Sequence, residues 1–286
     1  MASLSPTNRG NAASASVIDF GTVKLYNNMR VPNVSSFPCI MKDNLDGVTQ
    51  FTYFFANNKH IREIRFGKDA FELSVLSIKG IASDCENLEV LILPEVMTYV
   101  NDISSILQCT TTTNKVKECV VPDAPRVNIA NSMFYGCKNL EKATIGDIGT
   151  SATSVRVDYM FYKCENLETL SIGDISRANN TAGLLWVCNK LTDFSVKALP
   201  DTNMTNNEFS SCSSLSAQSY ANILAALPNT PNGSTIQFNK LFNDLVADKS
   251  VQYKARDIVT GTDITQTLED WANNATINKG WIITTL

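Results

Sequence analysis

Cysteine is the residue type whose number and spacing in this chain point most directly to chemistry. The chain of 286 residues contains eight cysteines, and six of them recur at separations of 24, 28, 27, 24 and 24 residues. These six are Cys85, Cys109, Cys137, Cys164, Cys188 and Cys212. Thiols can ligate zinc, form disulfides or act as nucleophiles, so each use has to be weighed against simple burial in a core.

The spacing of the cysteines argues against a zinc site. Zinc motifs need cysteine pairs about two to four residues apart, and no two cysteines here are closer than Cys109 and Cys119. A column of thiols at repeat spacing instead predicts a buried ladder, because cysteine is among the most buried residue types. Disulfides are the alternative to this ladder. In the ladder interpretation Cys119 fills an apolar strand position and Cys39 stays outside the repeat.

Catalytic motifs are missing around the other reactive side chains. His60 is the sole histidine of the sequence, and no G-x-S-x-G or H-E-x-x-H phrase accompanies it. The sequence also has no G-x-x-x-x-G-K-[ST] phosphate loop and no G-x-G-x-x-G after a strand. We therefore predict a chain that is not an enzyme, with no catalytic, cofactor-binding or metal-binding residue.

Two acidic patterns were weighed as calcium ligands. The segment Asp43–Gly47 (DNLDG) lacks the alternation and the closing glutamate of a calcium loop. Asp147 and Asp174 follow glycine in two matching GDI phrases and could line a calcium-binding edge of adjacent turns. Gly-Asp is more commonly the turn that leaves a strand, and we predict that role for both aspartates.

Composition and charge exclude several classes of function. The sequence is 44% apolar and 18% charged, which predicts a folded chain. A net charge of −4 and no Lys/Arg cluster argue against nucleic-acid binding. The longest apolar runs, such as Val90–Leu93, are far short of the roughly 20 residues of a membrane helix. Residues 1–16 lack a secretory signal, which predicts synthesis and retention in a reducing cytoplasm.

The cysteines belong to an internal repeat. The two best copies, MFYGCKNLEKATIGDI from Met133 and MFYKCENLETLSIGDI from Met160, agree at most positions. An apolar residue stands three places before each of the six cysteines, and after Cys85, Cys137, Cys164 and Cys188 apolar residues recur three, six and eight places on, which gives the pattern L-x-x-L-x-L. A degenerate copy begins at Phe54 with Asn58 in the cysteine place, and the copy around Cys109 carries a four-residue insertion before Val116. We count seven units.

The repeat predicts a solenoid. Its last two apolar positions lie two apart, as on one face of a strand, and the earlier ones suit a helical or irregular arm. One turn cannot bury its own inner face, so neighbouring turns must stack around a continuous core. Seven strands about 4.8 Å apart would make a parallel sheet roughly 30 Å long.

The phrase M-F-x-x-C-x-N-L-x-x-L-x-I, carried by Met133–Ile145 with Ala143 in its second leucine place and by Met160–Ile172, resembles BspA-like leucine-rich repeats of the gut Bacteroidales or phage type. The resemblance covers about residues 51–216. It implies an α/β repeat solenoid, a leucine-rich-repeat coil with a parallel β-sheet. Members of that family are mainly surface and adhesion proteins of bacteria and protists, and similar repeats occur in proteins of phages that infect gut Bacteroidales.

The two ends differ from the repeat. We predict a flexible arm over residues 1–16, an N-terminal cap with a strand at Val17–Tyr26 over residues 17–50, the solenoid over 51–216 and a helix/strand C-terminal cap over 217–286. In the last segment, Tyr220, Ile223, Leu224 and Leu227 share one helical face before Pro228. Thr235–Phe238 is predicted as a strand, Lys240–Ala247 as a short helix, Thr267 as an N-cap with Asp270 three residues on, and Trp281–Thr285 as a closing strand after Gly280.

Three functions were weighed. We favour a non-catalytic virion structural protein of a bacteriophage, a tail or capsid appendage made in the host cytoplasm that uses its repeat surface for assembly or host attachment. The alternative is a bacterial cell-surface adhesin or interaction protein whose signal peptide has been removed; an enzyme has no supporting motif. Expected partners are other protein subunits, a host surface receptor or glycan, and a second copy of the chain. Residues 1–16 are the predicted assembly contact, and the 110–115 insertion a projecting loop.

Overall fold

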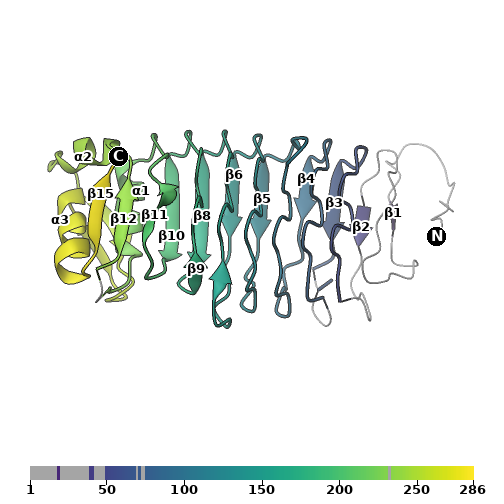
Figure 1. The fold of residues 1–286 in the computed structure, drawn as a ribbon, viewed down its shortest axis with the longest axis horizontal. Helices are drawn as coiled ribbons and strands as arrows, with labels where there is room; N and C mark the ends of the chain where they lie inside the picture. The colour runs from purple at the N-terminus through teal and green to yellow at the C-terminus, as the bar shows by residue number, and fades with distance from the viewer. Residues whose placement is uncertain (1–17, 20–38, 42–48, 69, 72–74, 231–232) are drawn as a thin grey trace.

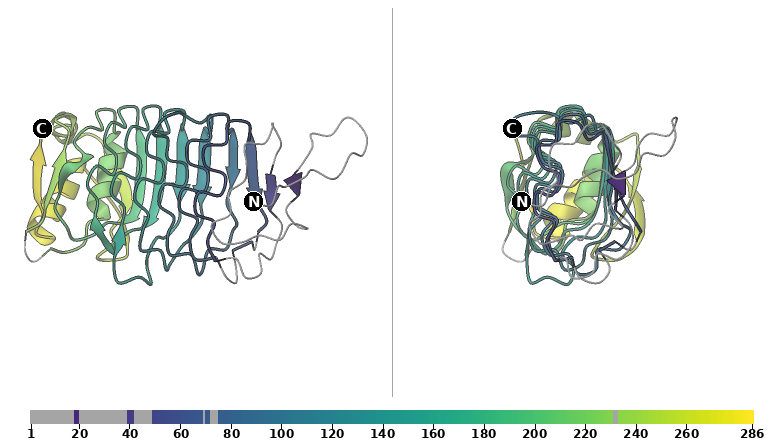
Figure 2. Two further views of the ribbon diagram at one scale, coloured as in Figure 1. Left: turned by 45° about the vertical axis from the view of Figure 1, so that its right-hand side comes forward. Right: turned by 90° about the vertical axis from the view of Figure 1, so that its right-hand side faces the viewer.

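The computed structural model describes residues 18–19, 39–41, 49–68, 70–71, 75–230 and 233–286. The chain winds into an elongated coil in which the strands of successive turns lie side by side along the long axis (Figure 1). The turns superimpose when the coil is viewed along that axis, and the helices gather at its C-terminal end (Figure 2). The predicted arm, residues 1–16, lies outside the described residues.

Parallel strands form one side of the coil, as the repeat predicts. The turns contribute β3 (Glu63–Phe66), β4 (Val90–Ile92), β5 (Glu118–Val121), β6 (Lys142–Ile145), β8 (Thr169–Asp174) and β10 (Asp193–Ala198), ordered β3-β4 in one sheet and β10-β8-β6-β5 in another. Within each strand the side chains alternate, so that Leu170 and Ile172 are buried while Thr169 and Ser171 face outward. The fold is a parallel β-solenoid with about six strand-bearing turns.

Two short strands extend the first sheet toward the N-terminus. β1 (Ile18–Asp19) pairs parallel with β2 (Cys39–Met41), which pairs with β3. Of the predicted strand at Val17–Tyr26, the described residues are Ile18 and Asp19. The backbone register aligns Cys39 with Ile64 and, through it, with Leu91. The expectation that Cys39 stays outside the repeat is therefore wrong: it occupies a strand position of the same coil.

The opposite side of the coil is an irregular arm, and hydrogen bonds connect the arms of adjacent turns. Alternate backbone N–H groups donate to the next turn, as from Phe134 to Met160 O (2.8 Å) and from Phe161 to Leu184 O (3.0 Å). Two short strands, β7 (Val155–Arg156) and β9 (Ala178–Asn180), pair in the same way. No α-helix occurs in the described residues before Ala217, so the arm is irregular and the α/β label does not describe the repeats.

The cysteine ladder lies inside the coil. In five turns the cysteine thiol lies close to a backbone carbonyl oxygen of the preceding turn. The residue that carries this oxygen stands three places before the position that matches the cysteine in that preceding turn. The Sγ–O distances are 3.0 Å for Cys85 to Phe55, 3.0 Å for Cys137 to Leu107, 3.2 Å for Cys164 to Phe134, 3.1 Å for Cys188 to Phe161 and 3.7 Å for Cys212 to Leu185. The thiol thus joins adjacent turns at a carbonyl that the irregular arm leaves with spare acceptor capacity. The buried ladder is confirmed at these five positions.

Cys109 departs from the ladder by one residue. Cys137 Sγ contacts Leu107 O, which places Leu107, and not Ile106, in the apolar position before the cysteine. Ser105 has the positive φ (57°) found at the matching place of other turns, as in Ser132 (56°). The inserted residues are therefore Thr110–Thr112, three and not four. The insertion lies between β4 and β5, which belong to two separate sheets.

The seventh repeat unit leads into a helix in place of a strand. Cys212 and Leu215 are buried as in other turns, and α1 (Ala217–Ala225) then packs beside β10, where Asn222 Nδ2 donates to Phe194 O (2.9 Å). Ser216 caps this helix by accepting from the Ser219 N–H. The predicted apolar face of Tyr220, Ile223, Leu224 and Leu227 is buried.

The remaining segment alternates strands and short helices. β11 (Met204–Phe209), β12 (Thr235–Phe238) and β15 (Ile282–Thr285) form a parallel sheet, with α2 (Leu241–Val246) following β12. A hairpin of β13 (Tyr253–Arg256) and β14 (Asp263–Gln266) was not predicted from the sequence. α3 (Leu268–Asn273) starts at the predicted capping box of Thr267 and Asp270, continues as a π-helix η2 (Asn274–Asn278), and ends before Gly280 at φ 81°.

Candidate protein-binding surface

Four aromatic side chains form a continuous strip on the outside of the coil. Tyr135, Tyr162 and Trp186 each stand two places before a ladder cysteine, and Tyr159 stands five places before one. These positions lie in the turn that leads toward the strand, where the ladder thiol and its apolar neighbours point inward. The stacking of the turns therefore lines up the three residues at the same place of adjacent repeats. We refer to the four residues as the aromatic strip.

The rings of the aromatic strip contact one another. The ring centroids of Tyr135 and Tyr162 are 4.7 Å apart, and those of Tyr162 and Trp186 are 5.0 Å apart, both pairs tilted by about half a right angle (47° and 51°). Tyr159 meets Tyr162 edge to face at 5.9 Å. Such separations fall within the range of favourable aromatic pairs. Trp186 is nevertheless 36% exposed and Tyr159 38% exposed, so the strip offers apolar area to a partner.

A missing side chain on the next turn makes room for Tyr159. A Cβ at Gly183 would lie 2.6 Å from Tyr159 Cδ1, closer than two carbon atoms can approach. Gly183 also has φ 64°, a conformation that glycine adopts without a steric cost. Glycine at position 183 therefore allows both the backbone conformation of the turn and the close approach of the Tyr159 ring. The same arrangement recurs at Gly80, beneath Tyr53.

One cationic side chain contacts the aromatic strip. Lys163 Nζ lies 5.0 Å from the centre of the Tyr162 ring, within the distance of a cation–π contact. Lys138 pairs with Glu165 (2.9 Å), and both side chains are about half exposed. Aromatic residues with a neighbouring cation are typical of the energetically dominant centres of protein interfaces, because they bury large apolar area at a low cost in conformational entropy.

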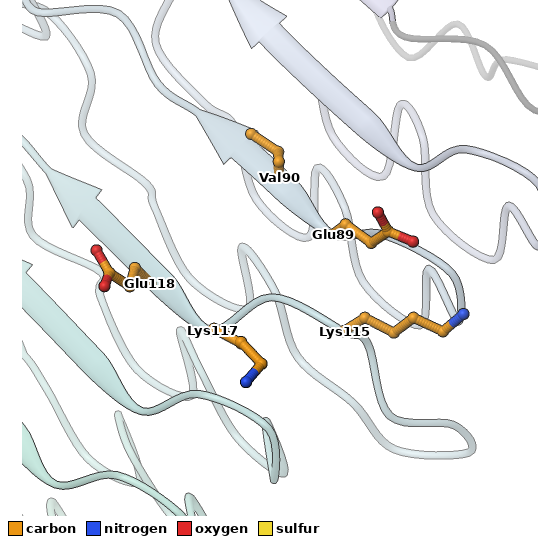
Figure 3. Close-up of a pocket in the computed structure, with 5 residues that line it drawn as sticks. All are labelled: Glu89, Val90, Lys115, Lys117 and Glu118. Carbon is orange, nitrogen blue, oxygen red and sulfur yellow. The ribbon is translucent and has the colours of Figure 1, made fainter.

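A second surface feature is the open groove where the two sheets meet. Figure 3 shows its lining residues, Glu89 and Val90 at the start of β4, Lys115 and Lys117 on the segment before β5, and Glu118 at the start of β5. Lys117 already pairs with Glu141 of the next turn (2.7 Å). The lining mixes both signs of charge along an open depression, with no enclosed cavity for a small ligand. We rank it below the aromatic strip as a binding surface.

The insertion is anchored to the coil by one carboxylate. Asp84 Oδ1 accepts from the N–H groups of Thr110 (2.7 Å) and Thr111 (3.0 Å), and Asp84 Oδ2 accepts from the Thr110 hydroxyl (2.7 Å). Burial alone raises the pKa of Asp84, but these hydrogen bonds outweigh it and lower the pKa below its ordinary value. The start of the 110–115 segment is therefore held against the preceding turn.

The two aspartates weighed as calcium ligands are engaged within the coil. Asp147 Oδ1 accepts from the Asp174 N–H (2.8 Å), and Asp147 Oδ2 pairs with Lys197 (2.6 Å). Asp123 accepts from the Asp147 N–H in the same way (2.8 Å), so Asp123 and Asp147 each cap the turn that follows the next strand. Asp174 Oδ1 accepts from the Ser176 N–H of its own turn (2.8 Å). His60 is exposed, and its backbone N–H donates to Asn58 Oδ1 (3.0 Å).

A search of the described residues finds no group of three or more histidine, cysteine, aspartate or glutamate side chains placed to hold a metal ion. Nor does any helix in the described part of the chain have the length and apolar character needed to cross a membrane.

Comparison with known protein families agrees with this geometry. Residues 108–230 match the model of the BspA type leucine-rich repeat region, in 6 copies. This segment is a BspA-type leucine-rich repeat region. No curated protein and no solved structure matches the chain at a significant level. The whole aromatic strip, from Tyr135 to Trp186, lies inside the BspA-type region.

Leucine-rich repeats of this kind provide surfaces for protein–protein interaction, and such solenoids are typically non-catalytic scaffolds. The aromatic strip was not predicted from the sequence. Its signal was present in the phrases MFYGC, MFYKC and LLWVC, each with an aromatic residue two places before the cysteine. One such residue is unremarkable, because single exposed aromatic side chains are common; the alignment of three by the stacking of turns is what makes a surface.

Proposed function

We propose that this chain is a non-catalytic virion structural protein of a bacteriophage, and that the aromatic strip is its contact with a neighbouring protein subunit. The observation that carries the proposal is the row of touching rings of Tyr135, Tyr162 and Trp186 on a stacked, rigid scaffold. A preformed row of aromatic side chains loses little entropy when it binds, which favours a protein partner.

The virion assignment draws its support from two features of the sequence. The repeat resembles those of proteins from gut Bacteroidales and their phages, and residues 1–16 are small and polar, as in arms that order against a neighbouring subunit. In this proposal the chain is made in the host cytoplasm, the arm makes an assembly contact, and the repeat surface faces a subunit or a host receptor. Residues 217–286 cap the C-terminal end of the coil in this proposal.

Footprinting of lysines in purified particles tests both parts of the proposal. An acetylating reagent is applied to intact virions and to the isolated chain, and the modified lysines are quantified by mass spectrometry. Lys163 beside Tyr162 should be protected several-fold in the particle, whereas Lys249, far along the chain in the C-terminal segment and 65% exposed, should react alike in both. Absence of the chain from purified particles would refute the virion role. Its recovery from the surface of intact bacteria would support the adhesin alternative.

Substitutions then test the strip itself. Trp186→Ala and Tyr162→Ala should each weaken the affinity of the chain for the neighbouring subunit by about tenfold, as expected for central aromatic residues of an interface. Tyr99→Ala is the matched control, because Tyr99 is 38% exposed and lies outside the strip. Equal affinity of all three variants would contradict the assignment of the strip while leaving the virion role to the particle experiment.

A further inference from the structure

Cys109 and Cys137 lie together in a way that no other described pair of cysteines does. Their Sγ atoms are 3.9 Å apart, and both are free thiols. The shift of register at the insertion causes this proximity, because Cys109 stands one place before the ladder position and Cys137 fills that position in the next turn. Cys109 is 6% exposed, whereas Cys137 is 1% exposed, so the shifted thiol is the nearer of the two to solvent.

A buried amide bridges the two sulfur atoms. Asn114 is fully buried, and its Nδ2 lies 3.3 Å from Cys109 Sγ and 3.5 Å from Cys137 Sγ. Its Oδ1 is occupied by the Val116 N–H (3.1 Å), which fixes the amide with its NH₂ group toward the thiols. An N–H donor stabilises the negative charge of a thiolate.

The surroundings make the two thiols unequal. The hydrogen bond from Cys137 lowers the pKa of Cys109, with Asn114 adding to the effect against the opposing influence of burial. Burial raises the pKa of Cys137 well above its ordinary value. A thiol with a lowered pKa that lies nearer to solvent than a neighbouring protonated thiol is the arrangement expected of an attacking and a resolving cysteine.

We propose that Cys109 and Cys137 are an oxidisable dithiol that hydrogen peroxide converts into a disulfide between two adjacent turns. The Cys109 thiolate attacks one peroxide oxygen, the O–O bond breaks, and Cys109 sulfenic acid forms with loss of hydroxide, which takes the thiol proton as water. Cys137 then attacks the Cys109 sulfur, the S–O bond breaks, and a second water leaves. Two thiols lose two electrons in total, and one peroxide is reduced to two waters.

The disulfide would fasten the insertion to the next turn. Bond formation brings the sulfur atoms from 3.9 Å to about 2.05 Å, a movement of the kind that χ1 adjustments and small backbone shifts can supply. Cys109 immediately precedes Thr110–Thr112, at the junction where β4 and β5 belong to separate sheets. The bond therefore joins the turn that leads to β5 with the turn that leads to β6, beside the break between β4 and β5.

Peptide mapping of the full chain after treatment with hydrogen peroxide tests the proposal. The reduced protein is treated with peroxide, blocked with iodoacetamide in denaturant, digested with trypsin and analysed with and without reductant. We expect two of the eight thiols to be lost and peptide 80–115 to be joined to peptide 127–138, which contains Cys137 as its sole cysteine. Retention of all eight thiols, or a disulfide elsewhere, would overturn the proposal.

Variants assign the two roles. Cys85→Ser leaves Cys109 as the sole cysteine of peptide 80–115, and this variant should form the same link. Cys109→Ser should lose it, and Cys137→Ser should accumulate a sulfenic acid on Cys109 that a dimedone probe traps. Circular dichroism confirms that each variant is folded. If folded Cys109→Ser loses two thiols as the wild type does, or if dimedone labels no Cys109 in Cys137→Ser, the assigned pair is wrong.

Discussion

Lys279 Nζ lies 2.8 Å from Asp257 Oδ2, and both side chains are almost completely buried. The ammonium group also donates to the carbonyl oxygens of Leu224 (3.2 Å) and Ala225 (3.0 Å) at the C-terminal end of α1. A cation at this end stabilises a helix because the last carbonyl groups are negative and lack partners within the helix. One lysine thus joins α1, the loop after β13 and the segment before β15.

Loss of this lysine should be costly. Lys279→Met removes one partner of a buried pair and leaves Asp257 uncompensated, which should lower the free energy of unfolding by about 3–5 kcal/mol. Urea denaturation followed by circular dichroism measures the change. The control is Lys254→Met, whose exposed pair with Asp263 (3.0 Å) is screened by water and should change the free energy of unfolding far less. Similar losses of unfolding free energy in both variants would show that the buried pair stabilises the fold no more than the exposed pair does.

Asp257 should make the fold sensitive to acid. Burial raises the pKa of this carboxyl, but hydrogen bonds from Lys279 and from the Thr260 and Val259 N–H groups outweigh it and hold the pKa below the ordinary value of 3.8. A carboxyl whose pKa is lowered on folding contributes stability above the unfolded value, and this contribution is lost as pH falls through the folded value. Asp257→Asn should therefore be less stable than the wild type at neutral pH, and should lose less stability between pH 5 and 3. If the wild type and Asp257→Asn lose the same amount of stability between pH 5 and 3, Asp257 does not cause the sensitivity to acid.

The register of the core can be tested at one strand of the solenoid. Leu170 is 1% exposed between its neighbours in β6 and β10, so Leu170→Ala should lower the free energy of unfolding by about 2–5 kcal/mol through loss of contact and formation of a cavity. Leu167→Ala should behave alike. Thr112→Ala keeps the backbone contacts of the insertion with Asp84 and should change stability by less than about 0.5 kcal/mol. Chemical denaturation of the three variants distinguishes the register from one shifted along the chain.

The glycine beneath Tyr159 should tolerate no side chain. Gly183→Ala combines a positive φ with a Cβ 2.6 Å from the tyrosine ring, so it should both destabilise the protein and move Tyr159. Gly261→Ala is the matched control, because Gly261 has φ 69° and no atom within 4 Å of the added Cβ. The control should lose about 1–2 kcal/mol from backbone strain alone, and Gly183→Ala more. Thermal unfolding measures the difference, and equal transition temperatures would show that the ring adjusts without cost.

Much of the fold follows from the sequence because every turn meets the same neighbours. The spacing of Cys137, Cys164 and Cys188 identifies which side chains face inward, and the structure confirms their burial. The helix that begins near Ser216 and the capping box of Thr267 and Asp270 were also predictable, since both rest on contacts between residues close in the chain. Strand positions and caps of this kind are set by local periodicity and by short-range hydrogen bonds.

Other features were decided by contacts between distant residues. The one-residue shift of Cys109 depends on how Asn114 and the inserted threonines fill the space after it. The spacing of the cysteines alone placed Cys109 in the ladder position, one residue away from its actual alignment. The two strands of the hairpin are four residues long each, and β14 has Ile264 as its one large apolar residue, so the alternation in β13 is too short to identify the pair of strands from the sequence. The partners of Lys279 are 22, 54 and 55 residues away along the chain, and no local pattern links them.

The sequence by itself determined the period, the inward face of each turn and the solenoid that follows from stacking them, because these depend on a pattern that repeats. Tertiary structure decided where that pattern is broken and what gathers outside it. Tyr135, Tyr162 and Trp186 became one surface, and Cys109 came to lie beside Cys137, only through the contact of one turn with the next. The inner positions can be predicted from the sequence because packing in the core requires apolar residues there. Exposed and shifted positions have no such requirement, so their arrangement is known only once the turns are stacked in space.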